Sequence, residues 1–272
     1  MALARRKTLV GVTRKQRGVK QGVERNREYD PFARIYNRHW GVDYWSEAVP
    51  VVERLLLSRV PAGAAVLDVC CGTGQFTGQV RRLGYDVAGM DGSGEMIRYA
   101  RENAPGVEFT VADVRDFALG RTFDAAYCVY ESLNHMPDIE DLRAALIRIR
   151  GHLKPGAPFL FDLNREEAYI CYWNNSDSIV EPDSVCVMRS EYDEEKKTGR
   201  YDVTAFERSG AGLSNEWRRE DFTLRQTCHG IGAADSALRS AGFGDVTLYD
   251  ARDIGMKGDA GYGRTFFLAL AL

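Results

Sequence analysis

The feature that most restricts the fold of this chain is an apolar strand that ends in a glycine-rich turn. Residues Ala65–Cys70 have the pattern of a short buried strand, Gly72-Thr-Gly74 forms the turn, and Gln75–Leu83 has the pattern of a helix. Glycine allows positive φ and a close approach of the backbone to a ligand. In an open α/β sheet, ligands bind outside the carboxyl ends of the strands. The segment therefore predicts an α/β sheet with a ligand site at this turn.

Strand and helix patterns alternate on both sides of a central interruption. Further strands are expected at 86–90, 107–111, 123–129, 157–163, 246–249 and 265–271, and helices at 93–103, 138–153 and 232–241, with Ser93 as a helix cap. Repeated strand–helix–strand units predict a parallel sheet with helices on both faces. Residues 164–230 break the alternation with three strand-like runs, which predict a small antiparallel insert.

This pattern gives a single domain preceded by a charged segment. The expected division is a basic arm at 1–27 and one domain at 28–272, which contains a helical cap (28–60), a cofactor-binding core (65–163), the insert or lid (164–230) and the C-terminal part of the core (231–272).

The glycine spacing excludes a dinucleotide fingerprint. Residues 72–78 read G-x-G-x-x-x-G, whereas the NAD-binding pattern is G-x-G-x-x-G. Asp68 lies within the end of the strand, four residues before Gly72, and an acid at this place suits a cationic ligand better than a pyrophosphate. The turn therefore favours a ligand with a positive charge.

The run Asp68-Val-Cys-Cys-Gly-Thr-Gly74 resembles the first motif of class I S-adenosylmethionine-dependent methyltransferases. That family more often has glycine where this chain has Cys70. The resemblance extends over about residues 29–272. It implies a Rossmann-like α/β fold, with a mostly parallel sheet, an antiparallel last strand and the β insert as a lid. It also implies S-adenosylmethionine as cofactor and S-adenosylhomocysteine as product.

The resemblance also implies roles for particular side chains. Asp68 lies where the methionyl ammonium, or a water bridging to it, is bound. Asp91 accepts hydrogen bonds from the ribose hydroxyls, and Met96 packs on the adenine. At Asp113-Val114 an acid or a backbone amide reads the adenine edge. The residues expected to bind the cofactor are Tyr29, Asp68, Cys70, Gly72, Gly74, Asp91, Gly92, Met96, Asp113, Val114 and Tyr130.

The acceptor side is expected in the N-terminal helix and in the loop Tyr130-Glu-Ser-Leu-Asn-His-Met136. The expected catalytic residues are Tyr36, Glu131 and His135. Each has a structural alternative, because Tyr36 can pack on the sheet and His135 can make a purely structural hydrogen bond. The insert resembles the lid of amino-sugar N,N-dimethyltransferases, so methyl transfer to nitrogen or oxygen of a small molecule is expected. The histidines and cysteines lack zinc-site spacing, so no metal is expected.

Charge leaves alternatives open. The formal net charge is −3, but residues 1–27 carry nine Lys or Arg against one acid. The arm is either a solvated extension or a segment that recruits an anionic partner such as RNA. An RNA methyltransferase is therefore the first alternative, although the loop lacks the Asn/Asp-Pro-Pro-Tyr motif of enzymes that methylate base amines, which argues against a nucleic-acid partner. A non-catalytic cofactor-binding protein is the second alternative.

Apolar segments are short throughout the chain. No window reaches the roughly 20 apolar residues of a membrane span, and no secretory signal is visible. The protein is therefore expected to be cytoplasmic, with no membrane partner. By analogy alone, the insert is a candidate interface for a homodimer.

Overall fold

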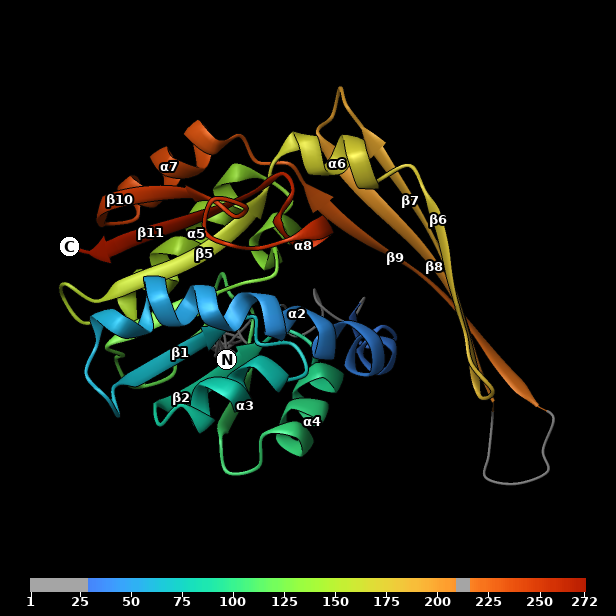
Figure 1. Ribbon diagram of the computed structural model, residues 1–272, viewed down its shortest axis with the longest axis horizontal. Coiled ribbons are helices and arrows are strands. Elements are labelled where there is room, and N and C mark those ends of the chain that lie inside the picture. Colours follow the sequence, from blue (N-terminus) through green and yellow to red (C-terminus); the bar gives the residue numbers. More distant parts are fainter. Residues whose placement is uncertain (1–28, 209–215) are drawn as a thin grey trace, which may run out of the picture.

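A seven-stranded sheet organises most of the chain (Figure 1). The computed structural model describes residues 29–208 and 216–272, so the predicted basic arm lies outside the described residues. The strand order is β10-β11-β5-β4-β1-β2-β3. The strands are β1 (Ala65–Val69), β2 (Asp86–Asp91), β3 (Glu108–Val111), β4 (Ala125–Cys128), β5 (Pro158–Asn164), β10 (Phe243–Asp250) and β11 (Arg264–Ala271).

The pairing of these strands matches the predicted fold. β1 pairs in parallel with β2 and β4, and β2–β3 and β4–β5 are also parallel. β11 runs antiparallel to both β5 and β10. The mostly parallel sheet with an antiparallel last strand is thus confirmed. Because β1 to β5 are parallel, their carboxyl ends meet at one edge of the sheet.

Helices cover both faces of this sheet. The helices are α2 (Ala33–Leu55), α3 (Gln75–Arg82), α4 (Gly94–Asn103), α5 (Ile139–Gly151), α6 (Glu166–Tyr172), α7 (Ile231–Ser240) and α8 (Gly258–Gly261), with short 3₁₀ turns η2 (Leu57–Arg59) and η3 (Ser132–His135). Alternate strand residues face opposite layers. Val66 packs with α2 and α3, whereas Leu67 packs with α5 and α7.

Local signals explain where two of these helices begin. The Ser93 hydroxyl accepts a hydrogen bond from the Met96 amide at 3.1 Å, which confirms the predicted cap of α4. The Asp138 carboxylate accepts one from the Asp141 amide at 2.8 Å at the start of α5. Both helices start directly above the carboxyl edge of the main sheet, so their caps fix the loops there.

A separate four-stranded antiparallel sheet follows β5. Its order is β6-β7-β8-β9, with β6 (Ser176–Val180), β7 (Ser184–Asp193), β8 (Thr198–Arg208) and β9 (Trp217–Thr227). Figure 1 shows this second sheet extending sideways from the main sheet. The three predicted strands correspond to β7, β8 and β9. The sequence pattern missed α6 and the exposed edge strand β6.

The first turns of α2 pack on the second sheet. Ile35 forms an apolar cluster with Met188, Val203 and other residues of β7 and β8. Arg34 pairs with Asp183 at 3.2 Å beyond the end of β6. The start of α2 and the second sheet therefore close over the carboxyl edge of the main sheet together. Among the described helices, none has both the length and the apolar character needed to cross a membrane.

Candidate functional site

A cavity of about 580 Å³ lies between the carboxyl ends of β1, β2 and β4, the start of α2 and the second sheet. This volume is within the range of small-molecule sites. Most of the predicted site residues line it, namely Tyr29, Tyr36, Cys70, Gly72, Asp91, Gly92, Met96, Asp113, Val114, Tyr130, Glu131 and His135. Predicted site residues up to about a hundred positions apart in the sequence therefore meet at one place.

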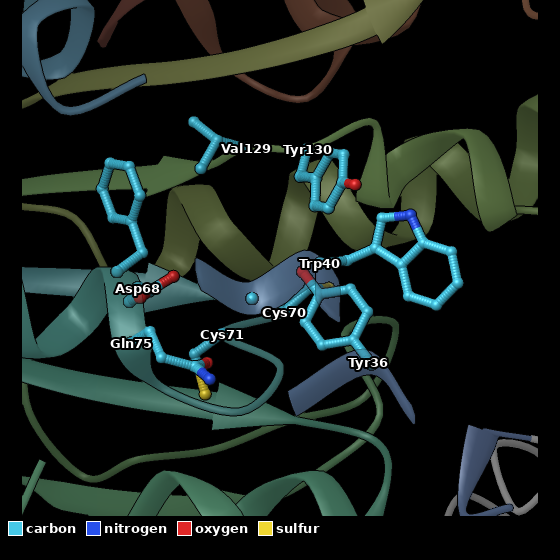
Figure 2. A pocket seen from close by; sticks show the side chains of 10 residues that line it. Tyr36, Trp40, Asp68, Cys70, Cys71, Gln75, Val129 and Tyr130 are labelled. Carbon is cyan, nitrogen blue, oxygen red and sulfur yellow. The ribbon is translucent and has the colours of Figure 1, made fainter. Parts of the chain in front are cut away.

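Asp68 lies in a smaller pocket of about 30 Å³ that shares Tyr36, Trp40, Cys70 and Tyr130 with the main cavity (Figure 2). The Asp68 side chain is buried and accepts a hydrogen bond from the Thr77 hydroxyl at 2.6 Å. Burial raises the pKa of this carboxyl to about 7. Asp68 therefore changes its charge close to neutral pH.

Gly74 is the remaining predicted residue, and it lines neither pocket. It has φ of +73° and precedes α3. A Cβ at this position would lie 2.8 Å from the Cα of Ala100 in α4. The position requires glycine for close packing between the turn and α4.

Asp91 connects the glycine-rich turn to the end of β2. Its carboxylate accepts hydrogen bonds from the Gly72 amide and the Ser93 amide, both at 2.9 Å. Burial raises its pKa, and the backbone amides oppose that effect because they stabilise the charged form. Each carboxylate oxygen has a second lone pair, so Asp91 can also accept hydrogen bonds from hydroxyl groups in the cavity.

Asp113 is tied to a neighbouring guanidinium. Arg115 donates to it through Nε at 2.8 Å and through Nη2 at 2.6 Å, and pairs with Asp141 at 2.7 Å. The Asp113 carboxylate is therefore oriented by Arg115, and its negative charge is largely balanced. Both options for reading an adenine edge, the Asp113 carboxylate and the Val114 backbone amide, belong to residues that line the cavity.

Three residues at the rim of the cavity have left-handed backbone conformations without being glycine. They are Cys70 (φ +58°), Tyr130 (φ +67°) and Glu131 (φ +44°). The conformation of Cys70 explains why glycine suits this position of the motif. Such strained residues concentrate at functional sites, because the surrounding structure must hold them in place.

His135 is held by contacts on both ring nitrogens. Nδ1 lies 2.7 Å from the carbonyl oxygen of Arg225 and also contacts the Tyr29 hydroxyl. Nε2 lies 3.1 Å from the Gln226 side-chain amide, which can donate to it. Burial lowers the pKa of His135 to about 4, so the ring is neutral at pH 7.

A buried cluster of charges supports the loop after β4. Arg264 of β11 pairs with Asp162 of β5 and with Glu131, and the Glu131 amide donates to Asp162 at 3.2 Å. Arg264 and Asp162 are fully enclosed, whereas the Glu131 side chain keeps 17% exposure and lines the cavity. Burial raises the pKa of both carboxyls, and the guanidinium opposes that effect.

The sequence predicted the insert as a lid, but it did not single out the residues that the second sheet and Trp40 contribute to the cavity. These residues include Trp40, Asp177, Ser178, Ile179, Met188, Tyr201, Val203, Leu224 and Gln226. The signals in the sequence were the resemblance of the insert to a lid and the alternation of residues in β7 and β8, which predicts a buried face without identifying what it covers.

Comparison with known proteins agrees with this geometry. Residues 66–156 match the family model described as a methyltransferase domain. Residues 66–156 of this chain are thus similar in sequence to a methyltransferase domain. The matched segment runs from β1 to just before β5, so it includes the glycine-rich turn, Asp91 and the loop with Glu131 and His135.

Two curated relatives are similar over this region. One is the dTDP-3-amino-3,4,6-trideoxy-alpha-D-glucopyranose N,N-dimethyltransferase of Streptomyces venezuelae, 36% identical over 116 residues, which are 43% of this chain and 48% of the relative. The other is a ubiquinone biosynthesis O-methyltransferase of Xanthomonas oryzae pv. oryzae, 37% identical over 153 residues, which are 52% of this chain and 62% of the relative. The chain thus spans about half the length of the curated relatives it matches.

A solved structure extends the likeness to most of the chain. An S-adenosylmethionine-dependent methyltransferase from Clostridium acetobutylicum superposes with a TM-score of 0.71 and 21% identity, covering 89% of this chain and 98% of that one. The chain therefore has the predicted Rossmann-like fold. The predicted resemblance to S-adenosylmethionine-dependent methyltransferases is confirmed by the family match and the curated relatives.

Proposed function

We propose that this protein transfers a methyl group from S-adenosylmethionine to a nitrogen or oxygen atom of a small molecule. One observation carries the proposal: most of the residues that the family resemblance assigns to the cofactor line a single cavity, which also contains the expected acceptor residues. S-adenosylmethionine supplies a methyl group on a positively charged sulfur, which is strongly electrophilic.

The residues of the cavity suit such a cofactor. The Asp91 carboxylate is a good acceptor for the two hydroxyls of a ribose, and the buried Met96 side chain offers an apolar contact to a base. Asp68, in the adjoining pocket, offers a carboxylate to an ammonium group. We assign the cofactor site to these three side chains and to the backbone at Gly72 and Val114.

The remaining residues are proposed to align the acceptor and exclude water. The start of α2 and the second sheet cover the cavity, and Tyr36 and Glu131 line it. Alignment of reactants alone can contribute about 7–11 kcal/mol to lowering a barrier. With a pKa of about 4, His135 is a weak proton acceptor, so we propose that it orients Tyr29 and the acceptor.

Calorimetric titration with S-adenosylmethionine and S-adenosylhomocysteine, with NAD as control, tests the proposal. Both sulfur compounds are expected to bind with micromolar affinity, and NAD is not expected to bind.

In Asp91→Ala, the affinity for S-adenosylmethionine is expected to fall about 100-fold, because two hydrogen bonds to a charged acceptor are lost. Asp86→Ala, at the opposite end of β2 and exposed, is the matched control and should bind normally. Unchanged binding in Asp91→Ala, or binding of NAD in wild type, would contradict the assignment.

The pH dependence of cofactor binding gives a second prediction. Below its raised pKa of about 7, Asp68 is mostly protonated and cannot pair with an ammonium group. Affinity for S-adenosylmethionine is therefore expected to rise about tenfold from pH 6 to pH 8, in step with the ionised fraction of Asp68.

Asp68→Asn is expected to bind weakly and without this rise. The exposed Asp116→Asn should keep the wild-type profile. Calorimetry at four pH values makes the comparison. A rise of the same size in Asp68→Asn would assign the titration to another group.

Other expectations remain predictions of the proposal. They are the division of residues 28–272 into cap, core and lid, a cytoplasmic location, and a homodimer formed through the second sheet. The catalytic roles of Tyr36, Glu131 and His135 also remain predictions.

A further inference from the structure

The charge of the cavity is one-sided. Among the described residues that line it, the charged ones are Asp91, Asp113, Glu131 and Asp177, and none is Lys or Arg. Arg115 largely balances Asp113 from behind, and His135 is neutral at pH 7. The cavity therefore favours a cation and disfavours an anion.

Glu131 is the acid best placed to act on an acceptor. Its Oε2 pairs with Arg264, which also holds the fully buried Asp162. Two carboxylates thus share one guanidinium, so the cluster carries a net negative charge when both are ionised. A buried cluster of this kind gains stability from a further positive partner. The exposed part of Glu131 faces the cavity, where such a partner can reach it.

We propose that the acceptor is an amine without a phosphate group, and that Oε1 of Glu131 binds it as its ammonium ion. This inference rests on the proposed methyl transfer and narrows its acceptor to nitrogen. The Streptomyces venezuelae relative is named for a dTDP-linked amino sugar, which carries a diphosphate. The acidic lining of this cavity disfavours a diphosphate inside it, while the amino group remains well matched.

For a primary amine, the proposed reaction begins with loss of a proton and continues with transfer of the methyl group. The bound ammonium ion gives up one proton, which Glu131 accepts or passes to water. The free lone pair on nitrogen forms the bond to the methyl carbon while the bond from that carbon to sulfur breaks. The electron pair of the broken bond stays on sulfur, which becomes neutral. The product is the N-methylammonium ion, and the enzyme regains its starting state when Glu131 loses the extra proton.

The aromatic and apolar walls of the cavity suggest simple probes. Phe32, Trp40 and Leu224 line it together with the acids. The matched pairs are phenethylamine with phenethyl alcohol and cyclohexylamine with cyclohexanol. A third pair compares the methyl glycoside of 3-amino-3,6-dideoxyglucose with the dTDP-linked form of the same sugar. Binding of each is measured calorimetrically to the full chain saturated with S-adenosylhomocysteine.

In wild type, each amine is expected to bind at least about tenfold more tightly than its alcohol, as for a charged hydrogen bond. The methyl glycoside is expected to bind more tightly than the dTDP-linked sugar. In Glu131→Gln the preference for amines should shrink to about twofold or less, with binding of the alcohols unchanged, which also shows that the cavity is intact. Glu102→Gln, an exposed acid of α4, should behave as wild type.

Three results would overturn the inference: equal binding of amines and alcohols in wild type, an unchanged preference in Glu131→Gln, or tighter binding of the dTDP-linked sugar. The wild-type comparisons do not depend on how well the variant folds. Failure of the proposed function would be seen separately, as absence of binding of S-adenosylhomocysteine itself.

Discussion

Replacing Arg264 by methionine is expected to lower the free energy of unfolding by about 3–5 kcal/mol, because removing one partner leaves buried charge uncompensated. Arg264 and Asp162 are both almost fully inaccessible to solvent, and Glu131 is nearby. Methionine has a similar length, so little packing volume is lost. Once the guanidinium is gone, the two carboxyls are expected to retain their protons up to a higher pH. Because protonated carboxyls are neutral, the loss in free energy of unfolding should be smaller in acid. Urea unfolding followed by circular dichroism measures the difference.

Two further variants test whether the loss of stability comes from the burial of uncompensated charge. Arg143→Met removes an exposed guanidinium that pairs with Glu140 at 3.3 Å on α5, and is expected to change stability by less than about 1 kcal/mol. Asp162→Asn combined with Arg264→Met should recover a large part of the loss, because the uncompensated charge is then removed. A loss below about 1 kcal/mol in Arg264→Met alone would mean that the cluster contributes little to stability.

The main sheet could be predicted because its signals are local. Buried strands such as β1 and β5 are short apolar runs, and the helices between them have their own caps and periodicity. Asp68 and Asp91 lie near the carboxyl ends of β1 and β2, so the same local patterns also locate these two acids. Since parallel strands share one carboxyl edge, their order in the sequence already implies that Asp68 and Asp91 lie near one site.

The rest of the site depends on contacts that no local pattern encodes. Arg264 lies 102 residues from Asp162, and no local pattern around either residue predicts that the two side chains pair. The left-handed backbone at Tyr130 and Glu131 carries no glycine that would mark it. β6 is an exposed edge strand with few apolar residues, so its sequence resembles a loop. Its contribution to the cavity arises only when the second sheet closes over α2.

A second large effect on stability is expected in the glycine-rich turn, where alanine substitutions at Gly74 and Gly72 form a matched pair. Gly74→Ala is expected to lower the free energy of unfolding by about 2–5 kcal/mol, as the sum of left-handed strain and overpacking. Its φ is +73°, and the new Cβ would lie 2.8 Å from both Cα and Cβ of Ala100. Because Ala100 lies within α4, the clash can be relieved only by moving that helix. Urea unfolding of the variant measures the loss.

Gly72→Ala tests the cofactor site through the same turn. Its φ is +53°, but the new Cβ would come no closer than 3.4 Å to the Tyr36 ring, so about 1–2 kcal/mol of left-handed strain is the expected cost. The added methyl group would project into the cavity that Gly72 and Tyr36 line. We therefore expect a folded protein that has lost most of its affinity for S-adenosylmethionine in calorimetry. If Gly72→Ala binds the cofactor normally, the backbone at this position does not approach it. If Gly74→Ala is as stable as Gly72→Ala, close packing on α4 is not the reason for glycine in the turn.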